Sequence, residues 1–116
     1  MTKIFVYGTL KRGFRAHSLM KGATFLREAI TKERFQLYDV GSFPSIAEDP
    51  DKKGGVKGEL FDATDEVMKV TDRYECIEDG LFRKDEVELE DGTKAISYFC
   101  NCSLEGARQI ENGVWE

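Results

Sequence analysis

Short runs of β-favouring residues, most of them bounded by glycine or other turn residues, constrain the fold more than any other feature of this sequence. These runs cover residues 3–7, 23–40, 56–61, 85–90 and 93–100. The clear helix signal lies at residues 65–76, where Thr64 suits an N-cap and Asp65 and Glu66 place acids in the first turn. We therefore expect an α+β protein with a largely antiparallel sheet, closed or half closed around a cavity.

Size and charge limit the possible classes of function. With 116 residues the chain has the length of one domain, which we expect to span residues 1–116. Its formal net charge of −5 argues against nucleic acid as a partner, because phosphate binding needs clustered Lys and Arg. No apolar run approaches the roughly 18–20 residues of a membrane span. The start is typical of a strand rather than a signal peptide, so we expect a cytoplasmic protein with a small-molecule partner and no membrane association.

Glycine positions predict three local features. Gly58 inside a β-favouring run indicates a bulge or a close approach of another backbone. Asp91-Gly92 between two such runs predicts a hairpin with a two-residue turn. In that register Val87 faces Ile96, and Tyr98 shares their face of the sheet. Turns are also expected at residues 41–44 and 49–55.

The cysteines and the histidine offer weak metal or nucleophile signals. Cys76, Cys100 and Cys102 are an odd number, which does not suit a disulfide framework. With His17 as the single histidine and no second Cys pair, we expect no metal site and reduced thiols at Cys100 and Cys102. Nothing in the flanking residues activates a Cys–His pair, and a structural role for His17 is favoured. The acidic residues at 85–91 are most simply the solvated face of a hairpin.

Tyr7-Gly8-Thr9-Leu10 is the first candidate site. Here a strand runs directly into a loop that begins with glycine, so successive backbone N–H groups could form an anion site or an oxyanion hole. Gly8 would let the backbone approach a ligand with no side chain in between. The alternative is a simple turn that ends the strand, which spacing alone favours.

Glu75 is the second candidate site. The apolar stripe of the predicted helix consists of Val67, Met68, Val70 and Tyr74. At 100° per residue, Glu75 falls about 80° from Val67, between Thr71 and Met68 and inside that stripe. Burial there would raise the pKa of its carboxyl group, as a general acid/base working near neutral pH requires. The alternatives are a Glu that extends into water at the helix end or one that pairs with Arg83.

These segments together resemble a known family. The motif Val6-Tyr7-Gly8-Thr9-Leu10-Lys11-Arg12-Gly13, with His17 after it, resembles the N-terminal signature of the γ-glutamylcyclotransferase-like (AIG2-like) proteins. The likeness continues in family order through Phe43-Pro44, residues 56–61, Asp72-Arg73-Tyr74-Glu75, Phe82-Arg83-Lys84 and the strand of Tyr98. It therefore spans most of the chain.

The resemblance implies a small mixed β-barrel, mostly antiparallel, flanked by helices and enclosing one central cavity. Family members convert γ-glutamyl amines or amides to 5-oxoproline and a free amine without a cofactor. Carried over, Glu75 is the general acid/base. Tyr7 and the backbone of Gly8, Thr9 and Leu10 would hold the glutamyl group of the substrate, and Tyr98 would orient Glu75 or the substrate.

This sequence departs from the family pattern near the predicted helix end. Many members have Leu and Gly where Thr71 and Cys76 stand here, and Tyr where Phe82 stands. The catalytic carboxylate is kept, but we expect a pocket of different shape. The identity of the amine that is released therefore does not follow from the resemblance. The competing interpretation is a non-catalytic protein that binds a small anionic ligand with the same loop and cavity.

Overall fold

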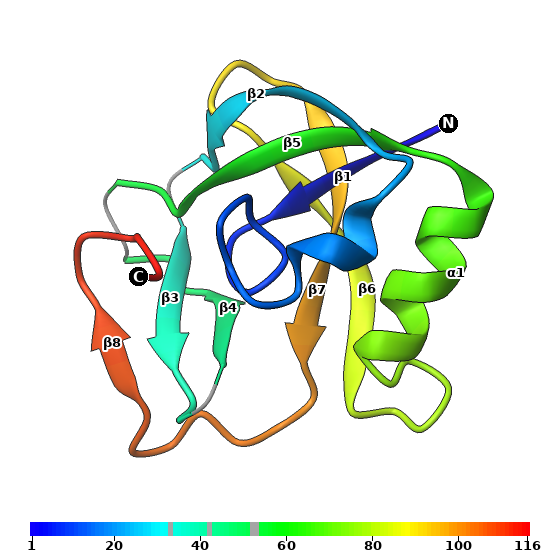
Figure 1. Cartoon of the computed structure of the whole chain (residues 1–116). Helices are drawn as coiled ribbons and strands as arrows, with labels where there is room; N and C mark the ends of the chain where they lie inside the picture. Colours follow the sequence, from blue (N-terminus) through cyan, green and yellow to red (C-terminus); the bar gives the residue numbers. More distant parts are fainter. Residues whose placement is uncertain (33, 42, 52–53) are drawn as a thin grey trace.

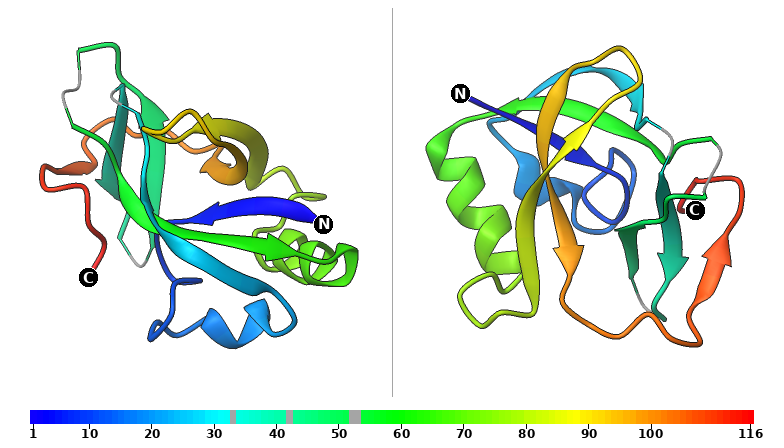
Figure 2. Two further views of the ribbon diagram at one scale, coloured as in Figure 1. Left: turned by 90° about the horizontal axis from the view of Figure 1, so that it is seen from above. Right: turned by 180° about the vertical axis from the view of Figure 1, so that it is seen from behind.

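Two β-sheets and one α-helix make up the described part of the chain, residues 1–32, 34–41, 43–51 and 54–116 of the computed structural model. The larger sheet contains, in spatial order, β2 (Thr24–Ile30), β5 (Lys57–Ala63), β1 (Thr2–Val6), β7 (Lys94–Cys100) and β6 (Phe82–Glu88). The smaller sheet contains β4 (Pro44–Glu48), β3 (Phe35–Asp39) and β8 (Arg108–Ile110). The helix α1 (Asp65–Tyr74) and the smaller sheet lie at opposite ends of the molecule (Figures 1 and 2).

The strand pairing confirms the expected mixed, mostly antiparallel α+β class. In the described residues β1 and β7 are parallel, and the other strand pairs are antiparallel. A short 3-10 helix, η1 (His17–Met20), follows the loop after β1. No helix in these ranges is both long enough and apolar enough to cross a membrane. Residues 42, 52 and 53 of the two expected turns lie outside the described residues.

The expectation of a closed barrel is wrong. Between the sheets, no strand ladder joins β4 to β7 in the described part of the chain; instead the Cys100 amide donates to the Ser45 hydroxyl, at 3.0 Å. Within the described residues, the edges of the larger sheet meet at one bridge, Thr31–Leu89. Beyond it β6 presents the exposed charged residues 83–86, as solvent-facing edge strands commonly do. The sheets therefore stay open.

Apolar side chains pack on both faces of the larger sheet. On one face, Ile4 and Val6 of β1 pack in a cluster with Val67 and Met68 of α1. On the other face, Phe5 and Tyr7 belong to a cluster that includes residues of the smaller sheet. The second half of β1 is buried on both faces, which agrees with the continuous apolar run from Ile4 to Tyr7. Gly58 permits the close backbone approach predicted for it, since a Cβ there would collide with the carbonyl oxygen of Val6 and would also lie 2.7 Å from the Phe5 ring.

The β6–β7 hairpin differs from the predicted register by one residue. Leu89 N donates to Thr93 O, so the loop has three residues, 90–92, and Gly92 has a φ of 91°. A three-residue loop with glycine in this conformation is a common alternative to the two-residue turn. Val87 consequently faces Ala95, not Ile96. The one-residue shift places Val87 on the opposite face from Tyr98.

The helix signals are confirmed, but the buried face is rotated from the predicted stripe. Thr64 Oγ1 accepts from Val67 N at 3.2 Å, which is the expected N-cap. The buried residues of α1 are Val67, Met68 and Thr71. Val70 and Tyr74 are each 38% exposed, although the helical wheel placed both in the apolar stripe. The buried face is therefore centred nearer to Thr71 and Glu75.

Cys100 and Cys102 form a disulfide, so the expectation of reduced thiols at these positions is wrong. Their Cα atoms are 5.2 Å apart, within the range that a disulfide spans. This separation is reached because β7 ends at Cys100 and the chain bends before Cys102. Cys76 has a free thiol.

Candidate active site

A cavity of about 210 Å³ lies where β1 ends, and it brings together all the residues predicted for the site. Its wall includes Tyr7, Gly8, Thr9, Leu10, Glu75 and Tyr98. The first four residues come from the loop after β1, Glu75 from the end of α1, and Tyr98 from β7. Chain segments far apart in sequence therefore converge on one space.

The loop after β1 has its carbonyl groups occupied and its amides available. The carbonyl oxygens of Gly8 and Thr9 accept from Lys11 N and Ala16 N, each at 3.0 Å. Across the described residues, the amides of Gly8, Thr9 and Leu10 donate to no other group of the protein. Successive unpaired N–H groups beside a cavity suit an anionic oxygen. The loop thus has the unpaired backbone N–H groups that the sequence predicted for it.

Gly8 meets a packing requirement as well. A Cβ at Gly8 would lie 2.5 Å from Cγ of Pro44, which also lines the cavity. Any side chain at this position would push the loop away from the start of β4. The absence of a side chain at Gly8 therefore allows the loop to pack against Pro44, a contact that the sequence did not indicate.

Glu75 is the C-cap residue of α1, and its carboxyl group faces a poorly solvated space. Burial raises the pKa of Glu75 to about 7. In the described ranges no cation forms an ion pair with it, and Arg83 instead lies 4.0 Å from Asp85 and over the Phe99 ring. Both alternatives considered for Glu75, extension into water and pairing with Arg83, are therefore unsupported. Near neutral pH such a group can both accept and donate a proton.

Tyr7 is buried beside Glu75, and its side chain connects the end of β1 to β7. Its hydroxyl donates to the Tyr98 carbonyl oxygen at 2.6 Å. Burial, and secondly the negative charge of Glu75, raise the pKa of Tyr7 far above its ordinary value. Tyr7 therefore stays protonated. Its hydroxyl group donates to the Tyr98 carbonyl oxygen, and its side chain lines the cavity.

The Tyr98 hydroxyl contacts α1 rather than Glu75. It donates to Asp72 Oδ1 at 2.6 Å and lies 2.7 Å from Thr71 Oγ1. Burial and the Asp72 carboxylate raise its pKa well above the usual range. Lys84 Nζ donates to the other oxygen of Asp72 at 2.8 Å. Tyr98 thus contacts the helix whose end carries Glu75 through Thr71 and Asp72, contacts that the sequence did not indicate.

Other residues also line the cavity, and of these only Phe82 was expected to affect its shape. They are Phe5, Val6, Arg15, Phe43, Pro44, Tyr74, Leu81, Phe82 and Ser97. Arg15 brings a positive charge to the wall, and Leu81, at 52% exposed, adds an apolar side chain open to solvent. His17 does not line the cavity, and its Nδ1 lies 2.9 Å from the Leu10 carbonyl oxygen, in agreement with a structural role.

Comparisons with known proteins agree on one family. A family model described as "Gamma-glutamyl cyclotransferase, AIG2-like" matches residues 4–116. A putative γ-glutamylcyclotransferase of Vibrio cholerae is 30% identical over 112 residues, covering 97% of this chain and 93% of that protein. The γ-glutamylaminecyclotransferase of Rattus norvegicus is 35% identical over 82 residues, covering 65% of this chain and 55% of that protein.

A solved structure has the same fold. The crystal structure of an AIG2-like protein from Mus musculus aligns with a TM-score of 0.80 and 26% identity, covering 96% of this chain and 86% of that one. Because the family model spans nearly all of the sequence, the chain belongs to the γ-glutamyl cyclotransferase, AIG2-like family.

Proposed function

We propose that the protein converts a γ-glutamyl amine or amide to 5-oxoproline and a free amine, with Glu75 as general acid/base. The observation that carries this proposal is the position of Glu75. Glu75 has a pKa of about 7 and no ion pair among the described residues, and it lines the same cavity as Gly8, Thr9 and Leu10, whose amides have no protein partner in those ranges and suit an anionic oxygen. Membership of the cyclotransferase family supports the reaction class.

The reaction begins with a proton transfer. Glu75, in its carboxylate form, takes a proton from the α-ammonium of the substrate. The resulting amine attacks the γ-carbonyl carbon of the same molecule and closes a five-membered ring. Because the nucleophile belongs to the substrate, no nucleophilic side chain is required, and the intramolecular attack has a high effective concentration.

The intermediate then collapses. Amides of Gly8, Thr9 and Leu10 stabilise the negative oxygen that forms on the carbonyl carbon. Glu75 returns its proton to the departing nitrogen, and the original amide bond breaks to release the free amine. The regenerated Glu75 carboxylate then takes the second proton from the ring nitrogen and passes it to the released amine, which leaves as the ammonium. One C–N bond forms and one breaks, so water is not consumed. A pKa near 7 suits these transfers, since Glu75 must act as base and then as acid.

Release of 5-oxoproline from a panel of γ-glutamyl compounds tests the proposal. The panel contains γ-glutamyl-ε-lysine, γ-glutamyl-alanine and glutathione. We expect product with the wild-type protein, and a loss of several orders of magnitude in kcat with Glu75→Gln, which keeps the size of the side chain but cannot transfer the proton. Glu78→Gln makes the same change at an exposed position and should retain the wild-type rate.

Two results would contradict the proposal. The first is a Glu75→Gln variant that keeps the wild-type rate, since the reaction would then use another acid/base. The second is saturable ligand binding by a folded wild-type protein that forms no product from any of these compounds. That second result would favour the non-catalytic, anion-binding interpretation.

A further inference from the structure

We propose that Glu59 is a positioning residue, which holds the loop of Gly8, Thr9 and Leu10 in place through Arg12. The inference rests on the proposed function, because it concerns the loop assigned there to the substrate. Glu59 does not line the cavity; it lies in the middle of β5 and is buried, at 8% exposed. Any influence on the reaction must therefore pass through another residue.

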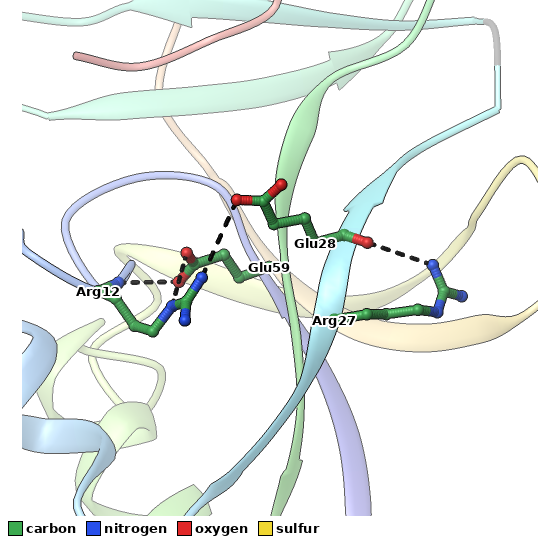
Figure 3. Close-up of polar contacts among 4 residues, drawn as sticks. All are labelled: Arg12, Arg27, Glu28 and Glu59. Atoms are coloured by element: carbon green, nitrogen blue, oxygen red, sulfur yellow. Dashed lines mark hydrogen bonds and ion pairs between the residues drawn. The ribbon is translucent and has the colours of Figure 1, made fainter.

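Glu59 binds Arg12 at two points (Figure 3). One carboxylate oxygen accepts from the main-chain amide of Arg12 at 2.8 Å, and the other accepts from its Nε at 3.1 Å. The first contact fixes the backbone at the end of the loop, and the second fixes the direction of the side chain. A carboxylate held by two charge-assisted contacts of this kind has little freedom to move.

The nearby carboxylate of Glu28 is a second reason for Arg12 to lie beside Glu59. Glu28 of β2 is directly opposite Glu59 in the strand register. Facing carboxylates on paired strands repel each other. The Arg12 guanidinium contacts both of them and lies 4.0 Å from Glu28 (Figure 3). It also lies over the ring of Phe25, at 3.6 Å. Charge and stacking both therefore favour one position for Arg12, and through it for the loop.

The other hydrogen bonds of the loop do not hold its amides in place, so the contact between Glu59 and Arg12 matters for their position. Gly8 and Thr9 use their carbonyl oxygens for turns within residues 8–16, and their amides have no protein partner in the described ranges. The amides that would face the substrate are thus not held by their own hydrogen bonds. Their position depends on neighbouring residues, and Arg12 lies two residues after Leu10. A displacement of about 1 Å at such a site can reduce rates on the order of 100-fold.

Glu59→Gln and Glu28→Gln form a matched pair for the test. Both remove one negative charge that faces the same guanidinium, but Glu28 has an 83% exposed side chain and, among the described residues, no hydrogen bond with the loop backbone. We expect Glu59→Gln to lower kcat/KM by roughly 10-fold to 100-fold, and Glu28→Gln to stay near the wild-type value. The pH at half-maximal rate should not change in either variant, because Glu75 is untouched.

Arg12→Ala separates the two contacts of Glu59. This variant keeps the main-chain amide that Glu59 accepts and removes the side-chain contact only. Its kcat/KM should therefore lie between those of the wild type and Glu59→Leu, which removes both contacts. Loss of thermal stability in Glu59→Gln with an unchanged kcat/KM of the folded protein would overturn the proposal, because the role of Glu59 would then be purely structural.

Backbone order parameters test the positioning without relying on activity. In the wild type and Glu28→Gln, the amides of Gly8, Thr9 and Leu10 should have values near 0.85, and in Glu59→Gln values below about 0.6. Unchanged order parameters in Glu59→Gln would overturn the proposal. Lower order parameters in a protein whose wild type forms no 5-oxoproline would support the positioning role of Glu59 and count against the proposed function alone.

Discussion

At the scale of single residues, the burial of Glu75 links stability to the proposed chemistry. Its pKa is raised from 4.5 to about 7 by burial, and in the described residues no cation forms an ion pair with it. The folded protein therefore binds a proton between these two pH values that the unfolded chain releases. By linkage, the free energy of unfolding falls as the pH rises through this interval.

We predict that Glu75→Gln stabilises the protein at high pH. Gln resembles the protonated carboxyl group and carries no charge to bury. Below pH 4.5 the variant and the wild type should be equally stable, because Glu75 is then neutral in both folded and unfolded states. Above pH 7 the variant should gain on the order of 3 kcal/mol, at about 1.4 kcal/mol per pKa unit. Urea unfolding at pH 4, 6 and 8 measures the difference.

The same series with Glu78→Gln is the control. Glu78 is exposed, so its replacement should change the free energy of unfolding little at any of these pH values. A Glu75→Gln variant whose gain does not depend on pH would contradict the raised pKa. The prediction does not depend on any substrate.

At the scale of elements, the end of α1 shows why position 76 matters. Cys76 has a φ of 54°, and the hydrogen bonds Cys76 N to Arg73 O and Ile77 N to Asp72 O, each 3.1 Å, close the helix. This is the Schellman arrangement, in which the residue after the C-cap is usually Gly. The Gly that many family members have at this position therefore has a conformational reason. Cys76 adopts the same left-handed backbone with a side chain attached.

Cys76→Gly should therefore stabilise the protein. An L-residue in the left-handed region is disfavoured by roughly 1–2 kcal/mol, and the greater freedom of Gly in the unfolded chain offsets part of this gain. We expect a net increase of about 0.5–1 kcal/mol in the free energy of unfolding, measured in urea. Cys76→Ala also removes the thiol but keeps a Cβ, so it should show no such increase. Equal stabilities of the two variants would contradict the role given to φ.

Local elements were predictable where the signal is local. The N-cap at Thr64 follows from the residue types at the start of the helix, and the inward position of Glu75 follows from helix periodicity. The structure has both. The hairpin at Asp91-Gly92 was predicted, but its register was not. Gly92 with a positive φ fits a three-residue loop as well as a two-residue turn, and the packing of Val87 against residues distant in sequence favours the former. Register therefore required tertiary information.

At the scale of the whole molecule, the parts of the cavity that the sequence did not predict come from distant segments. Arg15, Phe43 and Leu81 reach it from three different loops, and none has a periodic pattern that marks it. The open sheets have a similar cause. Alternating apolar residues predict strands but do not determine whether β4 and β7 form a ladder. The sheets meet through apolar packing and through the hydrogen bond between Ser45 and Cys100, which periodicity does not reveal.

Ser45 should therefore contribute to the stability of the whole molecule. It is fully buried, and its hydroxyl accepts from the Cys100 amide at 3.0 Å where the two sheets approach. Ser45→Ala leaves that buried amide without its partner, for which we expect a loss of about 1–3 kcal/mol in urea unfolding. Ser18→Ala, at an exposed position, should change stability little. Amide hydrogen exchange at Cys100 should also become faster in Ser45→Ala. Unchanged exchange at Cys100 would mean that the sheets are joined by apolar packing alone.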